Sequence, residues 1–497
     1  MAGLAGLLPV GTAGAAGLEN WQDAFHAALK EKPWLLAFRN ADREEYESRT
    51  GKDIQITGKV PADLKGTLWR TGPGGHEVGD LRYHHWFDGD GLAHGFRFDD
   101  GEIHHFGRMV DTPKRVAEQK AGKMLWATFG THLPGSLPMN GPDTVASANI
   151  NLMSHGGRLF AMWEGGSAQE LDPETLRFRG NIAWSPETKG MPFAAHPRLD
   201  QDGSLWSFGY APYANAVLLY HIRPDGTLAK VKLLRLKTVP MVHDFMITEK
   251  YVVLVLPPWN YAQPTGKTFL EKFVWQPERG GRVLVLDKQD FSVKADHSLP
   301  PFWVFHFGNA WEDGADHIRF DFSRYDDPKM TQATFKDVMR GEMSPGTGAI
   351  HTSARLNIRT GDYQETPLHR EGAAEFARID PRLNARRHRY STTLVADSTA
   401  RAGHPMFTNT VTFDLETGQA EGFQHGHTEI AEEALFVPRP GGTGERNGWI
   451  IQTVIDFGAA RSRLKIFDAE RLKDGPVAVA TLPYALPHGL HGTFQAG

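Results

Sequence analysis

Residues 239–247 read VPMVHDFMI, and residues 251–256 read YVVLVL, with the polar TEK between them. Two apolar, extended segments on either side of a short polar turn predict a β-hairpin. Because side chains alternate along a strand, His243 shares a face with Phe245 and Ile247 and is expected to point into the interior. For a single histidine of this kind, the simplest interpretation is a hydrogen-bonded core residue.

Three further histidines stand in the same kind of context, among apolar, glycine or proline neighbours. They are His196 in PFAAHP (192–197), His306 in WVFHFGNA (303–310) and His491 in PHGLHGTF (487–494). A single histidine of this kind is explained as a core residue, whereas four of them suggest a metal site. The spacings of 47, 63 and 185 residues are far too long for a zinc finger, whose ligands come from one short unit. Ligands this widely separated have to be brought together by a closed fold.

The composition narrows the classes of partner and of metal ligand. The chain has 497 residues, with 54 basic and 59 acidic side chains and a formal net charge of −5. This balance offers no electrostatic footprint for nucleic acid, so no nucleic-acid partner is expected. Cysteine is absent, which excludes disulfides and thiolate ligands, and any metal ion must be held by histidine, aspartate or glutamate.

The N-terminal region divides into two parts. Residues 1–17 are small and apolar, and they resemble the end of a secretory signal that lacks its basic beginning. We interpret them as the remnant of an export signal or, alternatively, as a disordered arm, which leaves a periplasmic or a cytoplasmic location open. Residues 18–50 are predicted to form an N-terminal helical segment, because Trp21, Phe25 and Leu29 recur at helical spacing. No later segment reaches the length needed to span a bilayer.

From residue 51 to residue 497 the pattern changes to short strands separated by Gly, Pro, Asp and Asn. Residues 66–70, 204–208 and 463–468 are examples, and no regular alternation of strands with helices appears. Many short antiparallel strands predict an all-β domain, specifically a β-propeller with blades of roughly 40–50 residues, which allows about seven blades. The innermost strand of each propeller blade lines the central axis. Histidines from four blades can therefore meet there.

Two irregular segments, 119–145 and 257–276, interrupt the strand pattern and are apolar although they look like loops. The simpler interpretation is a cap that packs on the propeller. The alternative is the apolar mouth of a tunnel that rests on a membrane surface and collects a lipid-like substrate. Peripheral membrane contact is therefore an expectation of the second interpretation only.

Several short motifs, in this order, make the chain similar to the carotenoid cleavage oxygenases from about residue 50 to the C-terminus. They are PADLKGTLWRTGP (61–73), HWFDGDG (85–91), AHP (195–197), HDF (243–245), HFGNAWE (306–312), EF (375–376), FVP (436–438) and HGTF (491–494). The resemblance implies a seven-bladed β-propeller with a helical and loop dome over an axial metal site. It also implies non-haem Fe(II) as the cofactor, held by four catalytic histidines: His196, His243, His306 and His491. Imidazole accepts Zn, Cu or Ni as well, so the choice of iron rests on the resemblance.

The resemblance further implies three glutamates that accept hydrogen bonds from the ligand histidines and so fix their orientation. By motif these are Glu164 in FAMWEGG, Glu375 before Phe376, and Glu433 ahead of LFVP. Glu432 is adjacent to Glu433, so the third assignment has an alternative. For each of the three, a solvated surface glutamate is the alternative interpretation.

The other histidines are predicted to make solvent or turn hydrogen bonds, because they stand in glycine-rich or charged contexts. His488 precedes His491 by three residues and is the residue with which it is most easily confused. The histidines set aside in this way are His76, His84, His85, His94, His104, His105, His388, His425, His427 and His488.

Two departures from the family pattern bear on the substrate tunnel. The family commonly has Asn-Thr where this chain has Asn149-Ile150, and the threonine methyl normally obstructs a coordination position of the metal. Ile150 keeps the bulk and loses the hydroxyl, and the retinoid-isomerising branch also has an aliphatic residue there. The stilbene-cleaving branch has a lysine before the matching glutamate, whereas Trp163 in this chain would supply an aromatic wall suited to an apolar polyene. Core packing is the alternative role for Trp163.

These expectations lead to a non-haem Fe(II) dioxygenase that uses O2 to cleave a C=C bond of a carotenoid or apocarotenoid into two carbonyl products. The first alternative is a stilbenoid-cleaving dioxygenase, and isomerase-like chemistry is a second. A propeller that only binds its ligand and has lost catalysis is a third, from a different functional class.

Overall fold

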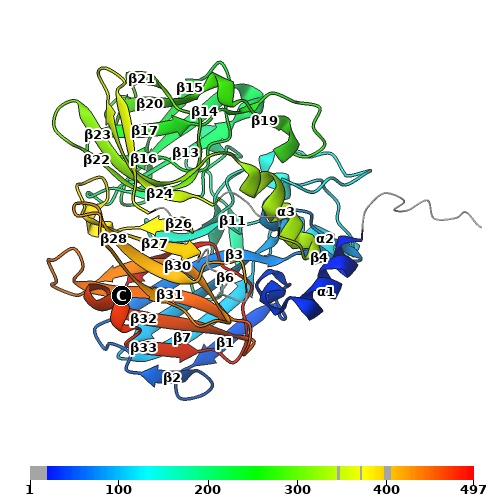
Figure 1. Ribbon diagram of the computed structural model, residues 1–497. Helices are drawn as coiled ribbons and strands as arrows, with labels where there is room; N and C mark the ends of the chain where they lie inside the picture. The colour runs from blue at the N-terminus through cyan, green and yellow to red at the C-terminus, as the bar shows by residue number, and fades with distance from the viewer. Residues whose placement is uncertain (1–19, 344–347, 370–371, 397–403) are drawn as a thin grey trace, which may run out of the picture.

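The computed structural model describes residues 20–343, 348–369, 372–396 and 404–497. Seven antiparallel sheets of four or five strands form the body of the molecule, each sheet being one blade of a propeller (Figure 1). This confirms the seven-bladed β-propeller predicted from the spacing of short strands. The export-signal remnant or disordered arm predicted over residues 1–17 lies outside the described residues.

The strands of each blade are given in order from the outer strand, which is far from the propeller axis, to the inner strand, which is next to the axis. In this order, blade 1 contains β1 (Glu45–Arg49), β7 (Glu102–Met109), β6 (Asp90–Asp99), β3 (Gly66–Gly75) and β34 (His491–Ala496). Blade 2 contains β11 (Phe178–Asn181), β10 (Gln169–Leu171), β9 (Arg158–Met162) and β8 (Asn151–His155). Blade 3 contains β15 (Leu228–Arg235), β14 (Ala216–Ile222), β13 (Leu205–Ala211) and β12 (Arg198–Leu199). Blade 4 contains β21 (Val293–Leu299), β20 (Gly281–Asp287), β17 (Tyr251–Leu256) and β16 (Met246–Ile247).

The remaining three blades follow the same order. Blade 5 contains β25 (Tyr363–Pro367), β24 (Ile350–Asn357), β23 (His317–Tyr325) and β22 (Trp303–Glu312). Blade 6 contains β29 (Ala420–Gln424), β28 (Asn409–Asp414), β27 (Tyr390–Ala396) and β26 (Ala373–Arg378). Blade 7 contains β2 (Gln55–Gly58), β33 (Ala478–Thr481), β32 (Arg461–Asp468), β31 (Gly448–Asp456) and β30 (Glu429–Pro438).

Burial rises from the outer to the inner strand of the blades. In blade 5 the outer strand β25 is almost entirely exposed, whereas nearly every residue of the inner strand β22 is buried. Blades also bury both faces of their middle strands, because each blade packs against its neighbours. Val253 and Val285 of blade 4, for example, share one buried cluster with Phe307 and Phe322 of blade 5. This packing explains the continuous apolar run YVVLVL.

The two ends of the chain close the ring of blades. Strand β34, near the C-terminus, pairs with β3 of blade 1, and His491 lies opposite Thr71 in this pairing. Strand β2, near the N-terminus, pairs with β33 of blade 7. In Figure 1 the blue N-terminal strands and the red C-terminal strands accordingly lie side by side. The closure brings His491 to the axis although it lies 185 residues after His306.

The principal helices gather on one side of the propeller (Figure 1). They are α1 (Trp21–Glu31), η1 (Pro33–Phe38), α2 (Pro113–Ala121), the π-helical turn η8 (Met330–Thr334), α3 (Phe335–Asp337) and η9 (Val338–Arg340). Asn20 caps α1 by accepting a hydrogen bond from the backbone N–H of Asp23. The predicted helical segment over 18–50 is correct for α1 and η1 but wrong for residues 45–49, which form β1. Tyr46 and Ser48 are buried there at the period of two that a strand requires.

Short 3-10 turns and two small sheets complete the connections. The turns are η2 (Trp86–Asp88), η3 (Pro142–Val145), η4 (Pro186–Thr188), η5 (Pro212–Ala214), η6 (Leu270–Lys272), η7 (Pro277–Arg279), η10 (Pro381–Leu383) and η11 (Ala469–Asp474). The small sheets pair β4 (Glu77–Val78) with β5 (Leu81–Arg82), and β18 (Trp259–Tyr261) with β19 (Phe273–Trp275).

The two irregular apolar segments differ in their exposure. Residues 257–276 include β18 and β19, and Trp259 is fully buried, with its ring edge-on to Trp303 at 4.9 Å between centroids. In contrast, Leu137 and Met139 of the segment 119–145 are 50% and 58% exposed. The first segment is thus a cap on the propeller, and the second presents apolar side chains outward. Among the described residues, no helix combines the length and hydrophobicity needed to cross a membrane.

Candidate metal centre and adjoining cavity

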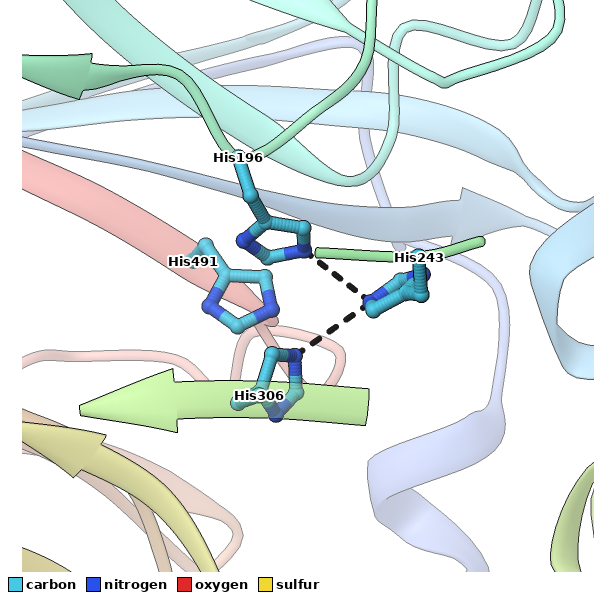
Figure 2. A group of neighbouring side chains, drawn as sticks. All are labelled: His196, His243, His306 and His491. Atoms are coloured by element: carbon cyan, nitrogen blue, oxygen red, sulfur yellow. Dashed lines mark hydrogen bonds between the residues drawn. The ribbon is translucent and has the colours of Figure 1, made fainter. Parts of the chain in front are cut away.

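Four histidines from four blades converge on the propeller axis. His196 and His243 shortly precede the inner strands β12 and β16, His306 lies within β22, and His491 begins β34. One ring nitrogen of each histidine lies within 4.8 Å of those of the other three. Figure 2 shows the four rings turned toward one another. This geometry could hold a metal ion.

The ring nitrogens that face one another are so close that their lone pairs need a proton or a cation between them. The Nε2 atoms of His196 and His243 are 3.0 Å apart, and those of His243 and His306 are 3.3 Å apart (Figure 2). All four rings are buried, with 3% to 8% of each residue exposed. Lone pairs that face one another in a buried site need a shared proton or a cation between them. A divalent cation satisfies all four nitrogens at once.

Carboxylates occupy the opposite side of three of the rings. Nδ1 of His306 lies 2.5 Å from Oε2 of Glu375, and Nδ1 of His491 lies 2.8 Å from Oε1 of Glu433. Nδ1 of His243 likewise contacts Oε1 of Glu164. A carboxylate accepts a hydrogen bond from the N–H group at Nδ1. This bond fixes the tautomer in which the lone pair is on Nε2, the atom that faces the cluster.

The pKa shifts of the rings bear on their ability to bind a metal cation. Burial lowers the pKa of His196 well below its ordinary value, and the neighbouring histidines lower it further. Burial also lowers the pKa of His491 to about 3, although Glu433 opposes that change. For His243, burial acts to lower the pKa, but Glu164, Asp244 and Glu375 together outweigh it and the net shift is upward. His196 and His491 are therefore neutral donors at pH 7, whereas the carboxylates around His243 favour its protonated form.

Bulges in the inner strands aim the functional side chains. In β22, the ladder with β23 is interrupted between Val304 and Phe307, at the position of His306. Equivalent irregularities lie directly after Glu375 in β26 and at Glu432–Glu433 in β30. A β-bulge redirects side chains that regular alternation would send elsewhere. An irregular backbone also directs Glu164 toward His243, because Glu164 adopts a left-handed φ of 77°.

Asp244 explains why the hairpin around His243 is shorter than predicted. Its carboxylate accepts the backbone N–H groups of Phe245 and Phe307 at 2.7 and 2.9 Å, and it pairs with Arg198 at 2.5 Å. These side-chain bonds replace ladder hydrogen bonds, so regular pairing begins only at β16. His243 is freed from the ladder and is buried, as the pattern predicted.

The two adjacent glutamates of β30 both lie within ion-pair distance of Arg70 but differ in their remaining partners. Glu433 contacts the ring of His491, whereas Glu432 accepts the backbone N–H of Gly489 at 2.7 Å and pairs with Arg70 at 3.4 Å. Both are buried, as is Glu375, so these three are not solvated surface residues. The side chain of Glu164 is somewhat more exposed, at 16%.

An apolar cavity adjoins the four-histidine cluster. His243, His306 and His491 line it, together with Ile150, whose backbone oxygen accepts the N–H of His491 at 3.2 Å. Aromatic rings form much of the remaining wall: Phe38, Trp86, Phe87, Phe305, Phe335 and Phe376.

Trp163 is not one of the described residues that line this cavity. Its ring instead packs over Gly165 and Gly166, where an added Cβ would lie 2.6 and 2.9 Å from it. Glu164 adopts a left-handed backbone conformation, and its side chain, not that of Trp163, contacts His243. The aromatic wall expected from Trp163 is supplied by phenylalanines from other parts of the chain.

Most of the histidines set aside from the metal site are buried rather than solvated, which corrects that expectation. His85, for example, bonds to the backbone oxygen of Thr331 and the backbone N–H of Phe87, at 2.9 and 3.1 Å. His488 lines the cavity, but its Nδ1 bonds to the oxygen of Gly489 at 2.7 Å and it stands outside the cluster.

Sequence reasoning missed Arg378 and Phe335. Arg378 donates from Nε to Oε1 of Glu433 at 2.7 Å and so holds the partner of His491. It stands three residues after Glu375 in an inner strand, and a charged residue in a buried strand is the signal that could have revealed it. Phe335 lines the cavity from a helix of the dome, and no local pattern marks it.

The chain is similar to known proteins along nearly its whole length. Residues 41–496 match the model of the family described as retinal pigment epithelial membrane protein. Isoeugenol monooxygenase of Pseudomonas putida is 28% identical over 89% of this chain and 94% of that protein. Apocarotenoid-15,15'-oxygenase of Synechocystis is 29% identical over 88% and 92%. Lignostilbene-alpha,beta-dioxygenase isozyme III of Sphingomonas paucimobilis is 30% identical over 89% and 93%.

The fold is likewise that of a solved relative. The crystal structure of cobalt-substituted Synechocystis ACO superimposes with a TM-score of 0.82 at 25% identity, covering 94% of this chain and 98% of that one. The chain belongs to this family, the carotenoid cleavage oxygenases.

Proposed function

We propose that this protein is a non-haem Fe(II) dioxygenase that uses O2 to cleave a C=C bond of a carotenoid or apocarotenoid and releases two carbonyl products. The observation that carries the proposal is the junction of two features: four buried imidazoles face one point, and a cavity lined by aromatic rings opens on them. The named relatives of this chain are oxygenases, among them an apocarotenoid oxygenase.

His196, His243, His306 and His491 would hold the iron through Nε2. Bound Fe(II) would supply the redox capacity that lets O2 react with an alkene. Glu164, Glu375 and Glu433 keep the Nδ1 protons of three rings in place, so the inward nitrogens remain donors. Ile150, in the cavity wall beside these rings, excludes water and narrows the approach to the cluster.

The cavity wall favours a conjugated hydrocarbon. Aromatic and aliphatic side chains bind the flat, apolar surface of a polyene without needing a polar partner. No lysine or arginine belongs to the wall among the described residues. A phenolate or carboxylate group of a substrate would therefore find no cationic partner there.

A second candidate is cleavage of a phenolic alkene such as a hydroxystilbene. The lignostilbene dioxygenase and the isoeugenol monooxygenase are as similar to this chain as the apocarotenoid oxygenase is. Tyr325 and Thr334 bring hydroxyl groups to the cavity wall and could bond a phenolic oxygen.

We further propose that the enzyme collects its substrate from a membrane surface. Leu137 and Met139 are about half exposed or more, and Val116 on α2 is 48% exposed. Apolar side chains in such positions bury themselves readily at a lipid interface. Flotation with phospholipid vesicles should fall for a Leu137→Glu, Met139→Glu double variant, and equal flotation of the wild type and the variant would contradict this proposal.

The test of the enzymatic proposal is product analysis. Fe(II)-loaded protein is supplied with a panel of apocarotenals and hydroxystilbenes under labelled O2, with His243→Ala as the inactive control. The expected result is loss of the polyene absorbance and label in both carbonyl products. Faster turnover of a hydroxystilbene than of every polyene would favour the second candidate, and no cleavage of either class would overturn both.

A further inference from the structure

A second, smaller cavity lies against the same histidines. His306 and His491 line both cavities, whereas His243 lines only the apolar one and His196 only the smaller one. The four-histidine cluster therefore forms part of the partition between two cavities. We call the smaller cavity the polar compartment, because its wall also contains Asn151, Arg198, Asp244, Arg378 and Glu433.

The wall of the polar compartment contains both fully buried and partly exposed side chains. The side chains of Arg198 and Arg378 are 17% and 28% exposed, whereas those of Asp244 and Glu433 are each 1% exposed. The arginines thus mark the end that solvent reaches. The histidines, of which at most 8% is exposed, mark the closed end.

The charges of the polar compartment are balanced. Arg198 pairs with Asp244 at 2.5 Å, and Arg378 pairs with Glu433 at 2.6 Å. Two cations matched by two anions leave no net positive charge in the wall. A divalent cation can therefore pass the arginines without the repulsion that unpaired guanidinium groups would exert.

Asn151 provides an unused acceptor near the closed end. Its Nδ2 donates to the backbone oxygen of Ala195 at 2.7 Å, the residue directly before His196. Its Oδ1 is buried and has no hydrogen-bond partner among the described residues. Water molecules around a hydrated metal ion present O–H donors, and an amide oxygen accepts them.

Apart from the histidines, the apolar cavity presents few polar side chains to a metal ion on its way to the cluster, namely Glu375, Tyr325 and Thr334. Much of its wall is built of phenylalanine and tryptophan rings. Moving a hydrated divalent ion through such surroundings strips water from the ion without replacing it, which is strongly unfavourable.

We propose that the divalent metal ion enters and leaves the four-histidine site through the polar compartment, while the apolar cavity is reserved for the organic substrate. This inference rests on the metal site of the proposed function. It has a consequence that the proposed function alone does not have: metal exchange continues when the apolar cavity is full.

The test compares two matched substitutions on the same strand. Ala377 lines the polar compartment and Ala373 lines the apolar cavity, and both belong to β26. Metal-free, full-length protein is mixed with Co(II), and uptake is followed by visible absorption in a stopped-flow instrument. Ala377→Leu should slow uptake by about tenfold or more, because the leucine crowds the passage, with an unchanged final content of cobalt. Ala373→Leu should take up cobalt at the wild-type rate.

A second arm uses wild-type protein and does not depend on either variant folding. The apolar cavity is filled with 1-dodecanol, whose saturated chain cannot be cleaved, and its binding is measured by equilibrium dialysis. Cobalt uptake should keep its rate. A block by dodecanol, or wild-type uptake by folded Ala377→Leu, would overturn the route. Absence of cobalt from wild-type protein at equilibrium is a different result, since it overturns the metal site itself and the route with it.

Discussion

Nδ1 of His491 lies 2.8 Å from Oε1 of Glu433, and that same oxygen accepts Nε of Arg378 at 2.7 Å. One carboxylate atom therefore joins a proposed metal ligand to an arginine of the neighbouring blade. Burial acts to raise the pKa of Glu433, but Arg378 and His491 outweigh it and hold the pKa at about 2. Glu433 consequently stays ionised and keeps its contact with the ring throughout the neutral and mildly acidic range.

Replacing Glu433 by glutamine is expected to weaken metal binding. The amide could present its N–H₂ group to the ring and would lose the charge that holds Arg378. Loss of such an outer partner lowers metal affinity by roughly 10- to 100-fold. Competition with a chelator for Co(II) measures this affinity directly, without the need for catalytic turnover.

Glu432→Gln is the matched control for this prediction. Glu432 is similarly buried but bonds Gly489 and Arg70 instead of a histidine of the cluster. We expect unchanged cobalt affinity and a lower free energy of unfolding, because Arg70 would keep a buried charge with a weaker partner. Equal losses of cobalt affinity in the two variants would show that the effect depends on a carboxylate lying near the cluster and not on its contact with His491.

Gly308→Ala is expected to destabilise the fold beside the site. A Cβ at position 308 would lie too close to Oδ2 of Asp321, well inside van der Waals contact. Asp321 cannot move away freely, because it is fully buried and accepts the hydroxyl of Ser391 at 2.8 Å. Overpacking of this kind costs about 1–3 kcal/mol, which urea unfolding detects. Gly444→Ala is the control, since its nearest neighbour would be 3.6 Å away, and a loss as large as that of Gly308→Ala would refute the explanation.

Stability should fall as the pH drops below 6.5, and His85 contributes to this fall. Burial lowers the pKa of His85 to about 3, while the unfolded chain titrates at its ordinary value of 6.5. Between these values only the unfolded state binds the proton, so folding loses stability as the pH decreases. For one such histidine the loss between about pH 7.5 and pH 5.5 is about 1.4 kcal/mol.

The measurement is urea unfolding of wild type and His85→Gln at the two pH values. Glutamine removes the titrating ring, so the variant should lose about 1.4 kcal/mol less than the wild type over this interval. Other buried histidines contribute equally to both proteins and cancel in the comparison. Parallel pH dependence in the two proteins would mean that His85 has the same pKa in the folded and unfolded states, which contradicts the prediction.

The convergence of the histidines is predictable because it follows from burial. His196, His243, His306 and His491 each stand among apolar residues, and a closed ring of blades leaves the axis as the natural meeting point. The number of blades follows from the spacing of short strands. These properties depend on composition and period, which a sequence displays directly.

The direction of individual side chains is less predictable. Glu375 and Glu433 reach their histidines at bulges, which arise where β26 and β30 pair with the neighbouring strands β27 and β31. The sequence favours Trp163 in the cavity wall, yet the left-handed backbone of Glu164 places the glutamate, and not the tryptophan, next to the cluster. Such turns are set by tertiary contacts that no local pattern records.

The predicted end of the N-terminal helical segment is wrong for a different reason. Residues 45–49 are polar, and their strand character shows only when Tyr46 and Ser48 are seen to be buried against blade 1. Burial by a partner that is distant in sequence decides the structure of such weakly patterned segments.

The central claim is that four imidazoles hold one metal ion at the inner end of the substrate cavity. Crystals of the protein soaked with Co(II) and measured at the cobalt absorption edge test it most directly, through the anomalous difference density. We expect a single strong peak between the Nε2 atoms of His196, His243, His306 and His491. A peak elsewhere, or none at this position in fully soaked crystals, would contradict it.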